Sequence, residues 1–182
     1  FWISVKYLGE QIENYFGSGN QKNVKIEYVW ENEPLGTIGA VSQIQNFEHD
    51  YVLITNSDLL TNIDYEQFFL DFIKQKADLA VLTIPYQVNI PYAVLETNNG
   101  TVKSFKEKPT YTYYSNGGIY LMKKEMLSHI PKNTFFNATD LMEELIKYDH
   151  KVISLPCSGY WLDVGKHEDF EKAQIDIHNI KF

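Results

Sequence analysis

The sequence predicts an α/β fold with a largely parallel sheet and antiparallel additions, and two observations lead to this prediction. In residues 1–86, short apolar runs alternate with segments whose apolar residues recur at helical spacing. Strands separated by helices are typical of a parallel sheet that is covered on both faces. From residue 92 onward, strand-like runs follow one another around turn residues, which indicates antiparallel pairing.

The first half is expected to contain four strands with a helix after each of the first three. The strands are predicted at residues 1–5, 24–30, 51–55 and 78–86, and those at 1–5 and 51–55 are expected to be buried. The helices are predicted around residues 8–16, 38–47 and 68–73. Thr37 is the expected N-cap of the second helix, and Asp64, with Gln67 as its N3 partner, is the expected N-cap of the third.

The second half is expected to begin with a hairpin, in which residues 92–96 and 101–109 pair around the turn sequence NNG. Further strands are predicted at 117–122, 151–156 and 160–164. Thr139 is the expected N-cap of the next helix, and a last helix is predicted at 167–179. No repeat or linker interrupts the sequence, so residues 1–182 are expected to form one domain.

The first residues of the chain predict a strand that has already begun. The sequence starts FWISV, without Met, a signal peptide or a polar tail. We therefore expect a fragment whose N-terminal part is missing.

Composition and charge exclude several classes of function. The net charge is −8 and the Lys and Arg residues form no cluster, so neither nucleic acid nor an anionic membrane is an expected partner. No apolar run approaches the ~20 residues that a membrane-spanning helix needs. Cys157 is the only cysteine, which excludes an internal disulfide or a cysteine zinc site and fits a reducing, cytoplasmic location.

Two carboxylates follow predicted strands in the same way. Asp58 comes just after the strand at 51–55, and Asp163 lies at the end of the strand at 160–164, before Gly165. In open α/β sheets, ligands bind beyond the carboxyl ends of the strands, and two carboxylates there can hold Mg²⁺. Asp is also a common turn former, so a turn without a ligand is the alternative for each residue.

The segment ENEPLGTIGA is a glycine-containing loop that leads into a predicted helix. Gly36 and Gly39 would allow a ligand to approach the backbone, and the start of a helix favours an anion or an electron-rich group. The segment matches neither the G-x-x-x-x-G-K-S/T phosphate loop nor the G-x-G-x-x-G fingerprint. A loop without a ligand is therefore the alternative interpretation.

Two further segments carry side chains that can bind sugars or phosphates. FKEKP places Glu107 and Lys108 at a strand end, where the carboxylate can accept hydrogen bonds from hydroxyls and the ammonium group can bind a phosphate. SNGGIY offers Asn116 as another ligand for hydroxyls. The alternatives are a solvated strand end and a simple loop. No Ser-His-Asp or Cys-His arrangement indicates nucleophilic catalysis.

Six segments in one order resemble the sugar-phosphate nucleotidyltransferases, most closely the mannose-1-phosphate guanylyltransferase-like group. The segments are ENEPLGTIGA, VLITNSDLL, PYAVLE, FKEKP, SNGGIY and YWLDVGKHEDF. The resemblance implies a Rossmann-like, three-layer (GT-A-like) fold. It also implies that an NTP, with GTP favoured, and a sugar 1-phosphate give an NDP-sugar and pyrophosphate, with Mg²⁺ as the cofactor. A GDP-mannose-like product is favoured, and a homo-oligomer would be consistent with the family.

The same resemblance implies roles for individual residues. The nucleotide would be bound by Glu33, Pro34, Gly36, Thr37 and Gly39. The metal would be held by Asp58 and Asp163. The sugar would be contacted by Tyr92, Ala93, Glu107 and Asn116, and its phosphate by Lys108. Catalysis would depend on Asp58, Asp163 and Lys108, chiefly through positioning and electrostatics.

Three features depart from the family pattern. Ser57 stands where the family usually has Gly before its metal-binding Asp, and Ala93 replaces the Gly of the family's YGV, which implies a different or looser sugar contact. The family's first strand and glycine-rich loop, with its Arg and Lys, are absent from this sequence. Because removing one such donor costs about 10²–10³ in rate, we expect the 182-residue chain alone to be inactive or nearly so.

Two other functions fit parts of the sequence. A non-catalytic sensor or regulatory domain of the same fold would keep the ligand pocket without the phosphate loop, although it would not need both carboxylates. A glycosyltransferase that uses an NDP-sugar would have a related fold. The D-x-D motif of many such enzymes is absent, however.

Overall fold

A computed structural model describes residues 1–181, which form two compact units. The first unit comprises residues 1–56, 75–80 and 120–153, and the second comprises 57–74, 81–119 and the residues from 154 onward. Each unit thus combines segments that lie far apart in the sequence. The assignment of residues 1–182 to one domain stays a prediction.

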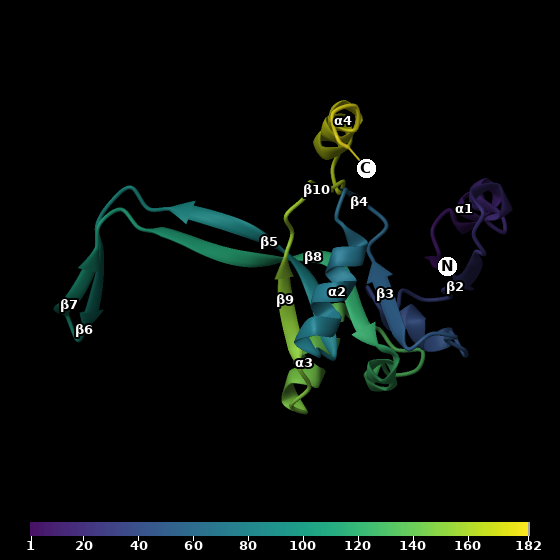
Figure 1. The fold of residues 1–182 in the computed structure, drawn as a ribbon, viewed down its shortest axis with the longest axis horizontal. Helices are drawn as coiled ribbons and strands as arrows, with labels where there is room; N and C mark the ends of the chain where they lie inside the picture. Colours follow the sequence, from purple (N-terminus) through teal and green to yellow (C-terminus); the bar gives the residue numbers. More distant parts are fainter. Residues whose placement is uncertain (182) are drawn as a thin grey trace. The chain divides into compact units, whose positions relative to one another are not determined.

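The four strands and two of the three helices predicted in the first half are present (Figure 1). The strands are β1 (Trp2–Val5), β2 (Glu27–Trp30), β3 (Tyr51–Thr55), β4 (Leu59–Thr61), β5 (Leu79–Asn89), β6 (Val94–Asn98), β7 (Thr101–Lys106), β8 (Thr110–Lys123), β9 (Val152–Pro156) and β10 (Trp161–Asp163). The α-helices are α1 (Gly9–Phe16), α2 (Tyr65–Gln75), α3 (Ala138–Lys147) and α4 (His167–Asp176). Among residues 1–181, no helix is long and apolar enough to cross a membrane.

The largest sheet has the strand order β3-β8-β5-β9. Strands β5 and β8 are antiparallel, as contacts at both of their ends show. In the first unit, the Lys123 amide donates to the Asp78 carbonyl at 3.0 Å, and in the second unit the Ile90 amide donates to the Pro109 carbonyl at 3.0 Å. The end of β8 therefore lies beside the start of β5, and the start of β8 lies beside the end of β5.

Strands β5 and β9 of this sheet are parallel. The Asp78 amide donates to the Lys151 carbonyl, and the Cys157 amide donates to the Thr83 carbonyl, so both chains advance in the same direction. Among the smaller sheets, β1–β2 is parallel, whereas β4–β10 and the β6–β7 hairpin are antiparallel. The predicted α/β fold with antiparallel additions is confirmed, and the sheet that was expected to be largely parallel is mixed.

Apolar residues at helical spacing supply the core of each unit. In the first unit, Leu141 and Leu145 lie one turn apart on α3 and are fully buried. In the second unit, Phe68 and Phe72 lie one turn apart on α2 and are also buried. Each such side chain contributes roughly 1.5–3 kcal/mol on burial. The Gln67 amide donates to Asp64 Oδ1 at 2.9 Å, which confirms the predicted cap of α2.

The helix predicted after Thr37, and its cap, are wrong. The segment forms only a short 3-10 helix, η2 (Gly39–Gln43), and the Thr37 hydroxyl instead accepts a hydrogen bond from the Ala138 amide at the start of α3. The predicted cap of α3 is also wrong, because Asn137 rather than Thr139 occupies the N-cap position. A contact between distant segments explains the first error, because Thr37 and Ala138 are 101 residues apart. The cap of α3 is local, since Asn137 forms a capping box with Asp140 three residues later.

Strands β1 and β3 are more exposed than the sequence predicts. Trp2 on β1 is 42% exposed, and Leu53 on β3 is 46% exposed. Within residues 1–181, β3 ends the strand order of its sheet and β1 pairs with β2 alone. An outer strand leaves one edge open to solvent. Apolar composition therefore predicted that these segments are strands, but not their place in the sheets.

Two strands differ from prediction in their extent. Strand β8 begins at Thr110 rather than at residue 117, because it follows β5 along that strand's whole length. The sequence does not predict β4 at all, although Leu59–Thr61, directly after Asp58, pair with β10.

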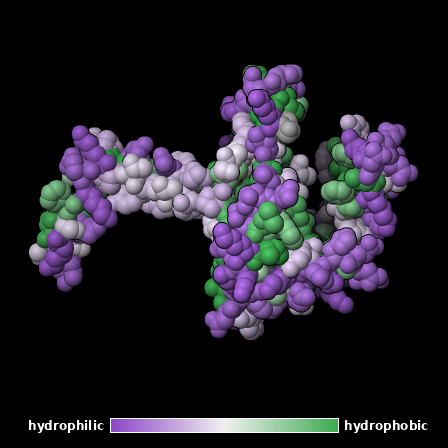
Figure 2. All heavy atoms as spheres, viewed as in Figure 1, coloured by the Kyte–Doolittle hydropathy of each residue, from purple (hydrophilic) through white to green (hydrophobic). Residues whose placement is uncertain are grey.

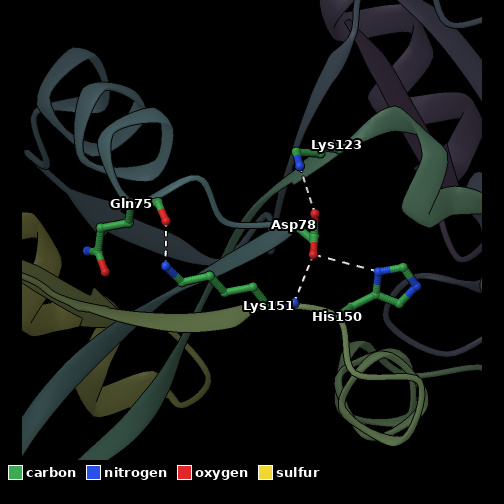
Figure 3. Close-up of polar contacts among 5 residues, drawn as sticks. All are labelled: Gln75, Asp78, Lys123, His150 and Lys151. Carbon is green, nitrogen blue, oxygen red and sulfur yellow. Dashed lines mark hydrogen bonds and ion pairs between the residues drawn. The ribbon is translucent and has the colours of Figure 1, made fainter.

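Asp78 joins the ends of three strands in the first unit (Figure 3). Its Oδ1 accepts a hydrogen bond from Lys123 Nζ and its Oδ2 accepts one from the Lys151 amide, each at 2.8 Å. His150 Nδ1 lies 3.6 Å from Oδ2. Burial raises the pKa of Asp78, but the hydrogen bonds from Lys123 and the Lys151 amide, with the charges of Lys123 and His150, outweigh it and lower this pKa. Asp78 therefore has a structural partner at each oxygen.

The β6–β7 hairpin of the second unit exposes apolar side chains (Figure 2). Leu95 and Phe105 pair across its two strands and are both more than half exposed. The register confirms the hairpin predicted around NNG.

Candidate functional site

Asp58 and Asp163 lie on neighbouring segments of the second unit. Strands β4 and β10 pair with Asp163 opposite Leu59, and the Val164 amide donates to the Asp58 carbonyl at 2.8 Å. The backbones of the two aspartates are therefore adjacent, and both residues are exposed. The structure thus brings together the two carboxylates that the sequence places 105 positions apart.

Asn62 fixes the other end of this strand pair. Its Oδ1 accepts the Tyr160 amide at 2.7 Å, and the neighbouring Thr61 hydroxyl donates to the Tyr160 carbonyl at 2.7 Å. A Cβ atom on Gly159 would lie only 2.6 Å from Asn62 Oδ1, so a larger residue there would displace the end of the Asn62 side chain. Sequence reasoning missed Asn62, since one Asn after a strand is an ordinary turn signal.

Trp161 ties β10 to the strand that carries Asn116. The Trp161 indole Nε1 donates to the Gly117 carbonyl at 2.8 Å. Asn116 lies within β8 and not in a loop, which was the alternative interpretation, and its Oδ1 accepts the Gly118 amide at 2.9 Å. The two strands that hold Asp163 and Asn116 are therefore directly connected by a side chain.

The donor set at the Asp58–Asp163 pair fits Mg²⁺. Within residues 1–181, no group of three or more His, Cys, Asp or Glu side chains is arranged to hold a metal ion. A structural zinc site needs four protein ligands. Mg²⁺, in contrast, keeps several waters and is commonly bound by one or two carboxylates together with substrate phosphates.

Four sugar-site candidates lie at the open end of the hairpin in the second unit, namely Tyr92, Ala93, Glu107 and Lys108. Val94 pairs with Lys106 at that end, so Ala93 and Glu107 enter and leave the hairpin side by side. All four candidates are exposed. Lys108 has φ +43°, a left-handed conformation that costs a residue other than glycine roughly 1–2 kcal/mol. Such strain in a turn is typical of a position that the surrounding structure must enforce.

The segment of residues 33–39, here the glycine loop, belongs to the first unit and is anchored by Glu31. The Leu35 amide donates to Glu31 Oε2 at 2.8 Å, and the Ser4 hydroxyl donates to the other carboxylate oxygen. Glu33 and Pro34 lie just before this anchor and are exposed. Glu31 therefore holds the loop at Leu35, on the far side of these two exposed residues. Sequence reasoning did not single out Glu31.

The two glycines of this loop pack against the segment that precedes α3. A Cβ atom on Gly36 would lie 2.7 Å from the Phe136 carbonyl oxygen, and one on Gly39 would lie 2.5 Å from that of Thr134. The amides of Ile38 and Gly39 both donate to the Phe136 carbonyl, at 3.2 and 3.1 Å. The chain's own backbone thus requires both glycines and occupies amides that the sequence had suggested for a ligand.

A protein-family model described as nucleotidyl transferase matches residues 1–180. A D-glycero-alpha-D-manno-heptose 1-phosphate guanylyltransferase from Aneurinibacillus thermoaerophilus is 30% identical over 97% of this chain and 77% of the relative. A mannose-1-phosphate guanylyltransferase from Mycobacterium tuberculosis is 28% identical over 96% of this chain and 50% of the relative. A UTP--glucose-1-phosphate uridylyltransferase from Synechocystis is 27% identical over 94% of this chain and 49% of the relative. The chain spans only about half the length of the last two.

Solved structures share the fold. HddC from Yersinia pseudotuberculosis superposes with a TM-score of 0.71 at 25% identity, over 97% of this chain and 77% of that one. A putative glucose-1-phosphate thymidylyltransferase from Bacillus anthracis superposes over the full chain with a TM-score of 0.74, covering 77% of that structure; at 22% identity it supports the fold alone.

Proposed function

The chain belongs to the nucleotidyl transferase family, and we propose that the protein converts an NTP and a sugar 1-phosphate into an NDP-sugar and pyrophosphate. The observation that carries this proposal is the 30% identity with a sugar-phosphate guanylyltransferase over 97% of the chain. A second relative is a mannose-1-phosphate guanylyltransferase by name. We therefore favour GTP as the NTP and a GDP-mannose-like product.

Asp58 and Asp163 are the proposed ligands of Mg²⁺. Asp163 lies on β10 and Asp58 directly precedes β4, so their backbones are adjacent; this and their exposed side chains support the role. When bound, Mg²⁺ supplies positive charge that offsets the charge of the phosphates.

The hairpin end is the proposed site of the sugar phosphate. Lys108 would hold the phosphate, an oxygen of which attacks the α-phosphorus of the NTP. The bond from that phosphorus to the bridging oxygen breaks, and pyrophosphate leaves with the electron pair. Glu107 and Asn116 would bind sugar hydroxyls, with Tyr92 and Ala93 beside them. Because binding aligns the two substrates, no covalent intermediate with the protein is required.

The glycine loop is the proposed nucleotide site, formed by Glu33, Pro34, Gly36, Thr37 and Gly39. The amides of Leu35, Ile38 and Gly39 already have partners within the chain. The nucleotide would therefore meet exposed side chains and carbonyl oxygens of this loop rather than those three amides. That arrangement suits a base, which offers donors of its own, better than a phosphate.

A turnover assay tests the proposal. The protein would be incubated with Mg²⁺, each of four NTPs and a panel of sugar 1-phosphates, and pyrophosphate release would be measured. We expect turnover with GTP and a mannose-like sugar phosphate. Saturable nucleotide-sugar binding without any turnover would instead support a sensor of the same fold, and absence of both binding and turnover would overturn the proposal.

We also propose that residues 1–182 alone turn over slowly. Their sequence contains no glycine-rich loop with Arg and Lys to hold the triphosphate, and donors of that kind are usually the largest contribution to such catalysis. Robust pyrophosphate release by the isolated 182-residue chain would disprove this part of the proposal.

A further inference from the structure

We propose that Asn137, at the start of α3, is a positioning residue for the nucleotide. It holds the glycine loop in the conformation that binds the nucleotide, through hydrogen bonds that link Thr37 to Asn137 and Ala138. This inference rests on the proposed function, because it concerns the loop assigned there to the nucleotide.

Two hydrogen bonds run in opposite directions between the loop and the helix start. The Thr37 amide donates to Asn137 Oδ1 at 3.3 Å, over a separation of 100 residues. The Ala138 amide donates to the Thr37 hydroxyl oxygen at 2.8 Å. Each segment thus satisfies a backbone donor of the other, and the Ala138 amide is one that a helix start otherwise leaves without an intrahelical partner.

Backbone contacts extend this pairing on both sides. The Phe136 amide donates to the Leu35 carbonyl at 2.9 Å, and the Phe136 carbonyl accepts the amides of Ile38 and Gly39. The loop therefore lies against the segment before α3 along most of its length, and Asn137 Oδ1 adds a side-chain acceptor to these backbone contacts.

The local conformation explains why the loop needs this external support. Gly36 has φ +76°, and the following segment makes only a short 3-10 helix, so the loop has little regular structure of its own. A loop that is held in its bound shape before the ligand arrives loses less conformational entropy on binding. Removal of Asn137 Oδ1 should therefore weaken nucleotide binding without any lost contact to the nucleotide itself.

Three variants separate this role from general helix stability. Asn137→Ala removes the oxygen that accepts the Thr37 amide, whereas Asn137→Asp keeps an oxygen at the same place. Asp140→Ala is the matched control, because Asp140 Oδ2 accepts the Asn137 amide at 2.8 Å and so stabilises the same helix start without touching the loop. Thr37→Val removes the acceptor on the other side of the pair.

Titration of each protein with Mg²⁺ and the preferred NTP, and separately with mannose 1-phosphate, provides the main measurement. We expect Asn137→Ala and Thr37→Val each to raise the Kd for the NTP about fivefold, as one lost hydrogen bond implies. We expect the Kd for the sugar phosphate to stay unchanged, Asn137→Asp to restore NTP binding, and Asp140→Ala to leave it unchanged. Hydrogen exchange should also become faster at residues 35–39 in Asn137→Ala and Thr37→Val, but not in Asp140→Ala.

The outcomes distinguish the two proposals. If the unaltered protein binds no NTP, the proposed function fails. If it binds NTP and Asn137→Ala binds equally well, or if Asp140→Ala weakens binding as much as Asn137→Ala does, the positioning role of Asn137 is overturned while the proposed function stands.

Discussion

The amide of Val164 donates to the carbonyl oxygen of Asp58 at 2.8 Å, and this one bond places two carboxylates from distant parts of the sequence on adjacent backbones. Asp163 precedes Val164 and pairs with Leu59, the residue that follows Asp58. Asp163 therefore lies within the strand pair, and Asp58 is held directly before it by the bond to the Val164 amide. A site built on paired strands is more precisely held than one built on loops.

This arrangement predicts that Asp58→Asn and Asp163→Asn each lower Mg²⁺-dependent turnover of the active protein by about 10²-fold or more, because an amide lacks the charge that holds the ion. Steady-state pyrophosphate release at several Mg²⁺ concentrations measures the effect, and thermal unfolding should show a fold that remains intact. Glu168→Gln, an exposed residue of α4, is the matched control and should keep full activity. Turnover near the unaltered rate in either Asp variant would place the metal elsewhere.

The sequence predicted much of this fold because apolar spacing is a local property. Helices α1 and α2, the NNG hairpin and the Asp64 cap of α2 all follow from neighbouring residues, and the structure confirms them. Strand order is not local. The exposure of Leu53 follows from the outer place of β3 in the sheet, which composition cannot specify.

The candidate site shows the same limit. The adjacent backbones of Asp58 and Asp163 agree with the hypothesis that they share a metal. Ala93 and Glu107 flank the Val94–Lys106 pair at the hairpin end, which agrees with a common sugar site. Thr37 differs, since its partner Ala138 is 101 residues away. A cap made across such a distance leaves no signal in either segment, so sequence reasoning assigned Thr37 to the nearest helix instead.

The bond from Trp161 Nε1 to the Gly117 carbonyl predicts a stability effect. Trp161→Phe should lower the free energy of unfolding by about 1–3 kcal/mol, because it removes the donor and leaves a buried carbonyl without that partner. Urea denaturation measures the change. Phe170→Leu, an exposed aromatic residue on α4, serves as control and should change stability by less than about 0.5 kcal/mol. Equal losses in the two variants would show that the indole bond has no special role.

The tight contact at Gly39 predicts a second stability effect. Gly39→Ala should destabilise the protein by about 1–3 kcal/mol, because the new methyl group would lie 2.5 Å from the Thr134 carbonyl oxygen and the loop or its neighbour must shift. Gly165→Ala is the control, since its added Cβ would meet only Asp163 Oδ1, at an ordinary 3.5 Å. Thermal unfolding of both variants gives the comparison, and an unchanged Tm for Gly39→Ala would contradict the packing of the loop against this segment.

The hydrogen bonds of Asp78 predict how stability depends on pH. Its pKa in the folded state lies below the ordinary value of 3.8, so the carboxylate contributes stability above that pH, and the contribution is lost as pH falls from about 4 through the folded-state pKa. The charged and titratable groups that face it are Lys123 and His150, and His129 stacks on His150 from the next segment.

The variant that tests this dependence is Asp78→Asn. At pH 7 it should cost about 1–2 kcal/mol, because the amide binds Lys123 more weakly and the exposure of Lys123 limits the effect. The difference in unfolding free energy between the two proteins should persist at pH 5 and shrink as pH falls below about 4 through the folded-state pKa, as the aspartate itself becomes protonated. Urea denaturation at each pH measures it. A difference that stays constant from pH 7 down to pH 2 would show that the loss is steric and that the charge of Asp78 does not stabilise these strand ends.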